Sequence, residues 1–340
     1  MILTLNIGSS SVKFGLFRNG SDPPREADAV HRGTIPSGGV PPRGVFEQIC
    51  SQLGDFEIDA VGHRIVFGGQ QHIVPECVTP ALLADLEGFI ALMPLHLPNE
   101  IAFVRESSAF FRNVPQVACF DTAFHADMPG IAKRIPIPRA FWQEGVQRYG
   151  YHGLSYEFIV YKLGADVVGR TIIAHLGNGA SLAAVRDGKP IDTTMGLSAL
   201  GGLMMGTRPG DLDPGVILYL MGRGFDAERV RTLLDEQSGL LGVSGTSSDV
   251  EQLLAIRASD SRAAEALDLF VYTVRKHIGA LGTVLGGIDR LIFTGGIGEH
   301  AAPIRDAIAD GLVSPDATHV IATDENLMIA RHAYRVLRMN

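Results

Sequence analysis

The chain alternates between apolar runs of strand length and stretches whose apolar residues recur with helical spacing. Short apolar runs bounded by turn-forming residues predict strands at 60–66, 116–120 and 290–294. Apolar positions three and four residues apart predict helices at 80–92, 215–221, 250–258, 262–285 and 325–337. This mixture predicts an α/β architecture in which the last helix packs back onto the first half of the chain.

Two segments share one pattern, LTLNIGSSSVKFGLFRNG at 3–20 and IIAHLGNGASLAAVRDGK at 172–189. Each reads as an apolar strand, a turn of Gly, Ser or Asn, a second apolar strand and a further turn with Gly. The turn residues Gly8 and Gly177 lie almost half the chain apart. This spacing indicates duplicated halves that meet at a cleft, each supplying one phosphate-facing hairpin.

The loops between these elements suggest how the chain is divided. Residues 18–42 concentrate proline, glycine and charge, and we interpret them as a surface loop and an edge strand rather than a linker. Prolines and a glycine-bounded segment between 120 and 151 mark the predicted crossover between halves. We therefore expect an N-terminal domain over 1–145, completed by a helix at 326–340, and a C-terminal domain over 146–325.

Composition and charge exclude several classes of protein. With 340 residues, 46% of them hydrophobic and 19% charged, the chain is globular rather than disordered or coiled coil. A net charge of −8 without any basic run argues against a nucleic-acid partner. Asp289 and Arg290 interrupt the apolar stretch 278–297, so we expect a helix, a turn and a strand there, not a membrane span. Three unpatterned cysteines and an N-terminus without a signal-peptide pattern predict a cytoplasmic location.

Glycine is the one residue type in excess, with 40 residues, and three segments combine it with a predicted turn. NIGSSSVKF places small residues before Lys13, HLGNGAS repeats this pattern at 175–181, and FTGGIGEH predicts a turn between a buried strand and a helix that begins near Pro303. Backbone N–H groups in such turns suit phosphate or ribose, because a side chain would block the approach. A single such turn is more often a plain Ser/Gly hairpin.

Four polar residues stand beside apolar or glycine-rich segments. Arg64 in GHRIVFGG and Arg208 in MMGTRPGDLDP each carry a guanidinium that suits a phosphate or a carboxylate. Asp121 follows an apolar strand in FDTAFH, and His152 stands in YGYHGLS. Taken one at a time, the arginines read as ordinary ion pairs, Asp121 as a helix N-cap and His152 as a buried, hydrogen-bonded histidine.

Together these segments resemble the acetate kinase family in order and spacing across nearly the whole chain. The matching motifs are NIGSSSVKF, GHRIVFGG, PLHLPNE, FDTAFH, YGYHGLS, HLGNGAS, MMGTRPGDLDP, LLGVSGTSSD, FTGGIGEH and TDENLMIAR. The resemblance implies two ribonuclease-H-like halves, as in the superfamily of acetate and sugar kinases, heat-shock ATPases and actin, with the nucleotide bound by the C-terminal domain. It also implies Mg²⁺-dependent, direct in-line transfer of the γ-phosphoryl group of ATP to acetate, with Mn²⁺ as an alternative ion. A homodimer is implied as well.

The resemblance assigns roles residue by residue. It implies catalytic roles for Arg64, His96, Asp121, His152 and Arg208, and Mg²⁺ ligands at Asn6 and Glu325. It implies an acyl pocket lined by Arg64, Val66, Leu95, Tyr151 and Ala199. It implies nucleotide contacts at Ser9, Ser11, Lys13, His175, Leu176, Gly177, Asn178, Gly179, Asp249, Val250, Glu251, Gly296, Ile297, Gly298, Glu299 and His300.

The chain departs from the family pattern at several of these places. Phe67 and Leu97 replace a histidine and an asparagine, Ala199 replaces a proline that helps wall the acyl pocket, and Tyr151 replaces a phenylalanine. Glu251 stands where an arginine normally lies against the adenosine. The chain is also shorter than typical members, in the early region and between 311 and 323.

These departures leave alternatives open. Loss of the proline ring at Ala199 should enlarge the acyl pocket, so propionate or another short acid is an alternative acceptor. The carboxylate of Glu251 makes a different phosphoryl donor an alternative to ATP. A nucleotide-binding regulatory module with decayed catalysis is a third alternative, although the retained charges argue against it, because buried charges are costly to keep without a function.

Overall fold

The computed structural model describes residues 1–8, 11–36 and 38–339. The described chain separates into two compact units, which we call the first and the second unit. The first unit comprises Met1–Ala126, Tyr151–Phe158 and Asp324–Asn340, and the second comprises Asp127–Gly150 and Ile159–Thr323. The first unit is therefore assembled from both ends of the sequence and one short segment near its middle.

The first unit is built on a six-stranded mixed sheet with the strand order β3-β2-β1-β4-β6-β5. Its strands are β1 (Ile2–Ile7), β2 (Ser11–Phe17), β3 (Ala29–Pro36), β4 (Ala60–Ile65), β5 (Glu76–Cys77) and β6 (Gln116–Phe120). Its helices are α1 (Pro42–Leu53), α2 (Pro80–Gly88), α3 (Leu97–Phe110) and α14 (Glu325–Met339), and α6 (Gly153–Leu163) begins here and ends in the second unit.

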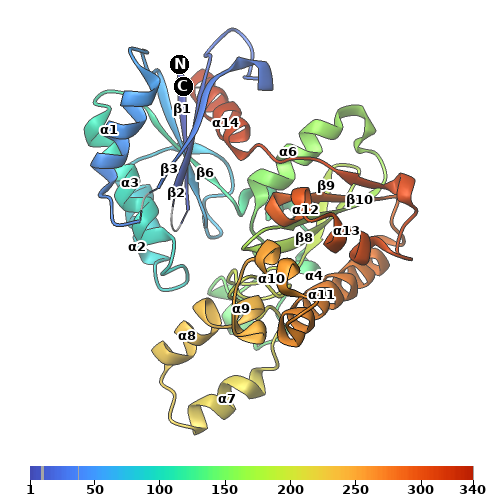
Figure 1. The fold of residues 1–340 in the computed structure, drawn as a ribbon. Helices are drawn as coiled ribbons and strands as arrows, with labels where there is room; N and C mark the ends of the chain where they lie inside the picture. The colour runs from blue at the N-terminus through green and yellow to red at the C-terminus, as the bar shows by residue number, and fades with distance from the viewer. Residues whose placement is uncertain (9–10, 37, 340) are drawn as a thin grey trace. The chain divides into compact units, whose positions relative to one another are not determined.

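Residues of β1 alternate between the two faces of this sheet, as the period of a strand requires. Leu3, Leu5 and Ile7 belong to a core shared with α1 and α3, in which Phe46 and Phe103 are fully buried. Thr4 and Asn6 point the other way and hydrogen-bond to the first turn of α14. Figure 1 shows α1 and α3 on one side of the sheet and α14 on the other.

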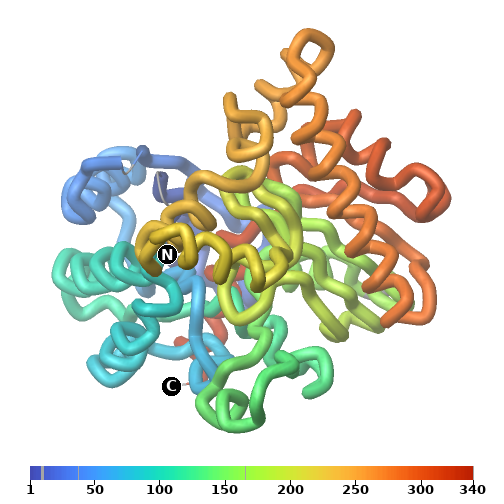
Figure 2. Tube along the Cα trace, turned by 90° about the horizontal axis from the view of Figure 1, so that it is seen from below, coloured from blue at the N-terminus to red at the C-terminus, as the bar shows by residue number. Residues whose placement is uncertain are grey.

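The second unit is built on a five-stranded mixed sheet with the order β11-β10-β7-β8-β9. Its strands are β7 (Arg170–Leu176), β8 (Ala180–Arg186), β9 (Lys189–Thr193), β10 (Arg290–Thr294) and β11 (Thr318–Val320). Its helices are α4 (Gly130–Lys133), α5 (Arg139–Gln143), α7 (Pro214–Gly222), α8 (Ala227–Glu236), α9 (Gly239–Ser244), α10 (Val250–Ile256), α11 (Ser261–Leu285), α12 (Gly295–His300) and α13 (Ala302–Ala309). The long helix α11 packs beside β7, β8 and β9 (Figure 2).

The two sheets repeat one topology, which confirms the duplicated α/β fold that the sequence predicts. In each, an antiparallel hairpin, β1–β2 or β7–β8, is extended by a third antiparallel strand, β3 or β9. In each, the first hairpin strand also pairs in parallel with the next strand of the sheet, β4 or β10. The register places Asn6 opposite Lys13 near the end of one hairpin and His175 opposite Ser181 near the end of the other.

The predicted strands at 60–66, 116–120 and 290–294 are confirmed as β4, β6 and β10, and the segment 18–42 does contain an edge strand, β3. The five predicted helices are also present, although α2 ends at Gly88, before the expected boundary. The stretch 278–297 divides into the end of α11, a turn, β10 and the start of α12. Among the described residues, no helix combines the length and apolar character needed to cross a membrane.

The turn expected in FTGGIGEH is wrong, because α12 begins at Gly295, directly after β10, and α13 then begins at Ala302. Glycine disfavours helices, so the sequence did not suggest this short helix. Gly295 has φ +77°, and a Cβ there would lie 2.8 Å from the Leu176 carbonyl oxygen. The Glu299 carboxylate accepts a 3.0 Å hydrogen bond from the Gly295 amide and so satisfies a donor at the helix start.

Candidate active site

Arg64 and Asp121 form a buried ion pair in the first unit. Arg64 lies on β4 and Asp121 follows β6, the strand that pairs with β4 in parallel. The Arg64 guanidinium donates from Nε at 2.9 Å and from Nη2 at 2.5 Å, both to Oδ2 of Asp121. Asp121 is fully buried, and its Oδ1 makes no hydrogen bond within the described part of the chain. Asp121 therefore orients Arg64 and does not serve as the helix N-cap that its position in the sequence also suggests.

The charge of this pair depends on burial and on neighbouring carboxylates. Burial opposes the charged form of Arg64, but Asp121, Glu325 and Glu100 outweigh it and raise the pKa of Arg64. Burial also raises the pKa of Asp121, although the Arg64 guanidinium favours its ionised form. Arg64 is thus a fixed cation in a site of low dielectric, which strengthens its attraction for an anion.

Glu100 is a second carboxylate beside Arg64, and sequence reasoning missed it. It lies in the first turn of α3 and is buried. Its Oε2 accepts a 2.9 Å hydrogen bond from the Val66 amide, while Oε1 lies 3.7 Å from Nη1 of Arg64. Burial raises the pKa of Glu100 to about 7, against the opposing effects of Arg64 and the Val66 amide. The sequence carries one signal for it, since Glu100 shares the buried face of the helix with Leu97, Ile101 and Val104.

Asn6 and Glu325 lie on the same face of the first sheet as Arg64. Nδ2 of Asn6 donates to Oε2 of Glu325 at 2.5 Å. On β4, Gly62 faces Ile329 of α14, and a Cβ at Gly62 would lie 2.5 Å from Cγ2 of that residue. Because side chains alternate along a strand, Arg64 shares the face of Gly62, while His63 points the opposite way to Gln116. The structure thus brings Asn6, Glu325, Arg64 and Asp121 together.

The predicted acyl-pocket residues of the first unit differ in burial. Val66 and Tyr151 are buried, and the ring of Tyr151 stacks on Phe67 with centroids 6.4 Å apart. Phe67 also packs edge to face against Phe89. Leu95, in contrast, is 42% exposed, and the next residue, His96, is the N-cap of α3. The first unit therefore provides an apolar wall beside Arg64, with Leu95 outside the buried part of it.

His152 adopts the left-handed conformation, with φ +59°, which is uncommon for a residue other than glycine. The next residue explains its position, because the Gly153 amide donates to the Asp121 carbonyl oxygen at 2.9 Å. A Cβ at Gly153 would lie 2.1 Å from that same oxygen, so only glycine allows this approach. His152 is thereby held next to Asp121 at the start of α6, as a partly exposed residue.

The second unit brings together two of the three predicted glycine segments. The turn Gly177–Gly179 ends the β7–β8 hairpin and is closed by a hydrogen bond from the Gly177 amide to the Gly179 carbonyl oxygen at 3.0 Å. Gly295, at the start of α12, packs against the backbone of Leu176. His175, Asn178, Gly296, Ile297 and His300 lie partly or fully exposed around this junction, whereas Leu176 and Gly298 are buried. Glu299 is tied to the protein itself, since its Oε1 also accepts a hydrogen bond from the Thr323 amide.

Arg208 lies in the second unit on a loop that is packed against the same turn. Nη1 of Arg208 donates to the Ala199 carbonyl oxygen at 2.8 Å, so two residues predicted for the site are in contact. The Gly206 amide donates to the Asn178 carbonyl oxygen at 3.0 Å. Gly239 has φ +60°, and a Cβ there would lie 2.2 Å from the Met205 carbonyl oxygen. Burial lowers the pKa of Arg208, and Asp235 offsets part of this effect.

The remaining residues predicted to contact the nucleotide belong to the start of α10 and to the β1–β2 hairpin. Asp249 caps α10 through a 2.9 Å hydrogen bond from the Gln252 amide, and Glu251 is exposed in the first turn of that helix, next to the buried Val250. Lys13 is exposed on β2, and Ser11 begins this strand. Ser9 lies outside the described residues. Asp249 thus has the structural role that its position before a helix would suggest.

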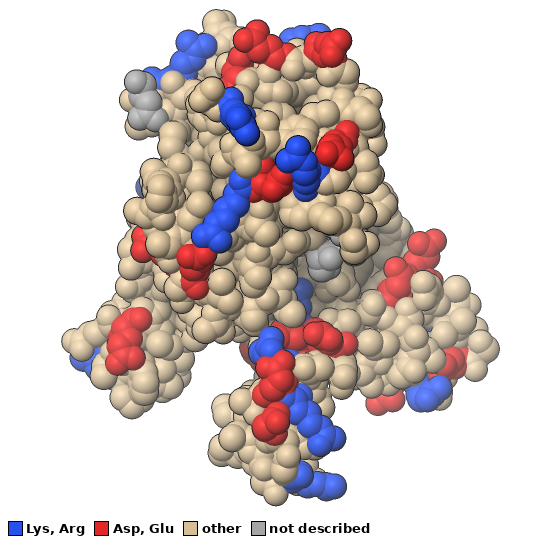
Figure 3. Space-filling view, turned by 90° about the vertical axis from the view of Figure 1, so that its left-hand side faces the viewer, with Lys and Arg blue, Asp and Glu red and all other residues tan. Residues whose placement is uncertain are grey.

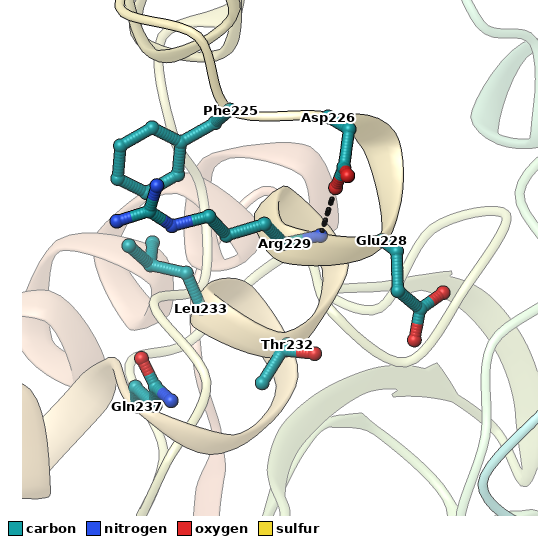
Figure 4. Close-up of a pocket in the computed structure, with 7 residues that line it drawn as sticks. All are labelled: Phe225, Asp226, Glu228, Arg229, Thr232, Leu233 and Gln237. Atoms are coloured by element: carbon teal, nitrogen blue, oxygen red, sulfur yellow. Dashed lines mark hydrogen bonds between the residues drawn. The ribbon is translucent and has the colours of Figure 1, made fainter.

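A cavity of 590 Å³ lies at α8, and none of the residues predicted for the site lines it. Figure 4 shows the Arg229 guanidinium over the Phe225 ring, 3.6 Å from its centroid, and Asp226 capping α8 through the Arg229 amide. The residues that line this cavity are Phe225, Asp226, Glu228, Arg229, Thr232, Leu233 and Gln237.

On the face drawn in Figure 3, acidic and basic side chains are interspersed, and the described residues form no broad patch of one sign there.

Comparisons with known proteins show the family of the chain. A family model described as the Acetokinase family matches residues 45–318. An acetate kinase from Rhodopseudomonas palustris is 39% identical over 393 aligned residues, which cover 99% of this chain and 98% of that protein. The alignment is longer than the chain itself, so this relative carries segments that the chain lacks.

Solved structures show the same likeness. An acetate kinase from Porphyromonas gingivalis superposes with a TM-score of 0.86 at 33% identity, covering 99% of both chains. A propionate kinase from Francisella tularensis superposes with a TM-score of 0.87 at 33% identity, covering 98% of this chain and 99% of the other. Both matches extend over the two units described above.

Proposed function

Because the chain belongs to the acetokinase family, we propose that it is a carboxylate kinase that transfers the γ-phosphoryl group of ATP reversibly to acetate. The observation that carries this proposal is the buried pair of Arg64 and Asp121, in which a carboxylate fixes the orientation of a guanidinium. A guanidinium held in this way offers its remaining N–H groups to a planar anion such as an acyl carboxylate.

The reaction joins two anions, so the site must neutralise both and hold them in line. A carboxylate oxygen of the substrate forms the new bond to the γ-phosphorus as the bond to the β,γ-bridging oxygen breaks, and ADP leaves with those electrons. We assign the acyl carboxylate to Arg64, and the transferring phosphoryl group to Arg208 and His152, with His96 as a further residue that lines the catalytic site. Asp121 orients Arg64 and takes no proton, because the attacking carboxylate has none to lose.

We place Mg²⁺ at Asn6 and Glu325. Mg²⁺ prefers oxygen ligands, keeps several waters and is often bound through one carboxylate plus substrate phosphates. Glu325 offers a carboxylate beside the Asn6 amide, and the unpartnered Oδ1 of the buried Asp121 is suited to a metal-bound water. The ion, when bound, neutralises phosphate charge. Activity lost in EDTA and restored by MgCl₂ would support this assignment, and Glu325→Gln should raise the Mg²⁺ concentration required.

The acceptor and the donor each have an alternative. Ala199 and the similarity to a propionate kinase favour propionate or another short acid as a second acceptor. Glu251, exposed in the first turn of α10, carries no cation for an adenosine contact and accepts hydrogen bonds from ribose or from the guanine amine. We therefore expect ATP and GTP to give comparable kcat/KM values, with pyrophosphate much poorer, and Glu251→Arg to lower the KM for ATP. Strong ATP selectivity that is unchanged in Glu251→Arg would contradict this reading.

We also propose a homodimer in the cytoplasm, organised in the two domains predicted from the sequence. Helix α7 supports the dimer, because Leu218, Tyr219 and Met221 are more than half exposed on it. Sedimentation velocity should show a dimer for the wild type and for Ile131→Asp, another exposed apolar site, and a monomer for Leu218→Asp. A monomeric wild type at micromolar concentration would contradict the proposal.

The decisive test of the activity is an acyl-phosphate assay. Purified protein with Mg²⁺ and ATP should convert acetate to acetyl phosphate, which hydroxylamine traps as a hydroxamate. A panel of short acids, tested with ATP, GTP and pyrophosphate, defines the acceptor and the donor in one experiment. If no acid yields a hydroxamate while ATP still binds in calorimetry, the chain is a nucleotide-binding regulatory module rather than a kinase.

A further inference from the structure

Glu100 and Asp121 are two buried carboxyl groups beside the Arg64 guanidinium, and the proposed acyl substrate would bring a third. Asp121 occupies the Nε and Nη2 edge of Arg64, which leaves Nη1 for other partners. Oε1 of Glu100 lies 3.7 Å from Nη1 and makes no hydrogen bond within the described residues. The other carboxylate oxygen, Oε2, is engaged by the Val66 amide. The unpartnered atom of Glu100 therefore faces the part of Arg64 that a bound carboxylate would use.

The charges around Glu100 come from several elements. Arg64 on β4 is the cation, and Asp121 after β6 is the nearest further carboxylate. Glu325 of α14 acts on both Arg64 and Asp121. His96 caps the same helix, and its carbonyl oxygen accepts from the Glu100 amide. The charged groups of α1 and α2 that meet α3 pair farther along it, Arg43 with Glu106 and Glu87 with Arg105, while His63 of β4 faces Gln116.

We propose that Glu100 takes up a proton when a carboxylate substrate binds at Arg64, so that binding of the acid is coupled to proton uptake. This inference rests on the proposed function, since it requires the acyl carboxylate at Arg64. One guanidinium cannot balance three buried carboxylates, and two like charges at one site drive a proton onto one of them. Two hydrogen bonds from Arg64 favour the ionised form of Asp121, and the substrate must stay ionised to attack. Glu100 receives no hydrogen bond from Arg64, so Glu100 is the group that changes.

The structure also indicates which atom receives the proton. Because Oε2 accepts from the Val66 amide, the proton belongs on Oε1, the oxygen without a partner. A protonated Oε1 becomes a donor, and a carboxylate at Nη1 of Arg64 is an acceptor next to it. Glu100 is thus a positioning residue that is repulsive to the substrate when ionised and attractive when protonated. The burial that raises the pKa of Glu100 to about 7 brings this exchange into the working pH range.

Two measurements test this coupling. The first is the KM for acetate at saturating MgATP from pH 6 to pH 9, where the acid itself stays ionised. Above about pH 7, KM in the wild type should rise by up to about tenfold per pH unit. Glu100→Gln keeps an acceptor for the Val66 amide but cannot titrate, so its KM should be nearly independent of pH. Glu106→Gln, the same change at a partly exposed residue of α3 that pairs with Arg43, should follow the wild type.

The second measurement is calorimetry of acetate binding in two buffers of different ionisation enthalpy at pH 8. The wild type and Glu106→Gln should take up close to one proton for each acetate bound, and Glu100→Gln should take up none. A wild type that binds acetate without proton uptake, or a Glu100→Gln variant that retains the wild-type uptake and pH slope, would refute the coupling. The wild-type calorimetry decides the matter even if the variant does not fold.

Failure of the proposed function gives a different result. In that case the wild type forms no acyl phosphate from any acid, whereas acetate binding and its proton uptake are still measurable by calorimetry. If acetate does not bind at all, neither the acceptor role of Arg64 nor the coupling survives. An active enzyme with pH-independent acetate binding overturns the coupling alone.

Discussion

Arg64 gives both of its short hydrogen bonds to a single oxygen of Asp121, Oδ2, and not one to each oxygen of the carboxylate. The guanidinium is therefore gripped along its Nε and Nη2 edge, and its plane is set by a residue that is itself fully buried. An arginine fixed in this way loses little conformational freedom when it binds an anion. Its fixed plane also favours a planar anion whose oxygens match the free N–H groups.

Arg64→Ala should lower kcat/KM for acetate by about a hundredfold or more, because it removes charge-assisted contacts worth about 3 kcal/mol in a buried site. Arg64→Lys should recover little activity, since a lysine lacks the planar fork. Arg43→Ala, which removes an exposed ion pair with Glu106, is the matched control and should leave kcat/KM unchanged. Near-native activity in a folded Arg64→Ala would show that the acyl group binds elsewhere.

Gly239→Ala should destabilise the second unit and lower activity together. The left-handed φ of +60° and the contact with the Met205 carbonyl oxygen make any side chain there strained, at a cost of about 2 kcal/mol or more. The backbone of Arg208 lies next to the same Cβ position, so relief of the clash moves that arginine. Thermal unfolding and kcat/KM measure the two effects. Gly279→Ala, in open space within α11, should instead stabilise the protein by up to about 1 kcal/mol.

Ala199→Pro should shift the preference for acceptors toward acetate. In the wild type we expect propionate to be used nearly as well as acetate, because one methylene in an apolar pocket changes binding by only about 1 to 3 kcal/mol. A proline keeps the carbonyl oxygen that accepts from Arg208, so that hydrogen bond can persist in the variant. The readout is kcat/KM for both acids in both proteins. A wild-type preference for acetate of two orders of magnitude would rule out an enlarged pocket.

His63 should make the protein less stable in acid. Burial lowers the pKa of His63 to about 4 in the folded state, where it pairs with Gln116, whereas the unfolded chain binds the proton below about 6.5. The free energy of unfolding should therefore fall as pH drops from about 6.5 to about 4, by up to about 3 kcal/mol. Urea denaturation of the wild type and His63→Gln at several pH values measures this.

The difference between these two proteins at each pH is the readout, because Glu100 contributes the opposite slope. The pKa of Glu100 is raised in the folded state, so its share of stability is lost as pH rises from about 4.5 to about 7. A difference between wild type and His63→Gln that does not change with pH would mean that His63 is not the group responsible.

The duplicated hairpins were predictable because strand, turn and strand are close in sequence and their apolar pattern is local. The two units also share one parallel pairing, of β1 with β4 in the first and of β7 with β10 in the second. Asp121 required the structure, since its position after a strand and before a helical turn fits an N-cap as well as a partner for Arg64. Only the parallel pairing of β4 with β6 places the two side chains together.

Glu100 and α12 show where local patterns fail. A glutamate in the first turn of a helix is favourable for the helix itself, so this position does not distinguish a solvated Glu100 from a buried one. Only its place among Leu97, Ile101 and Val104 hints at burial. Its burial arises from the packing of α3 against β4, which brings the Val66 amide to its carboxylate. Helix α12 begins with the sequence GGIG, which has a low helix propensity. The helix is nevertheless formed, because the Glu299 carboxylate accepts from the Gly295 amide and Gly295 packs closely against Leu176.

The packing of α14 on β1 also affects the order in which the first unit can fold during synthesis. Asn6 leaves the ribosome early, but its partner Glu325 is synthesised 319 positions later, on the order of tens of seconds at ordinary rates of translation. Until then Thr4, Asn6 and Gly62 lack the helix that covers their face of the sheet, although every strand of the second unit precedes that helix in the sequence and is synthesised before it. The nascent first unit thus keeps one face of its sheet uncovered until the last segment of the chain has been made.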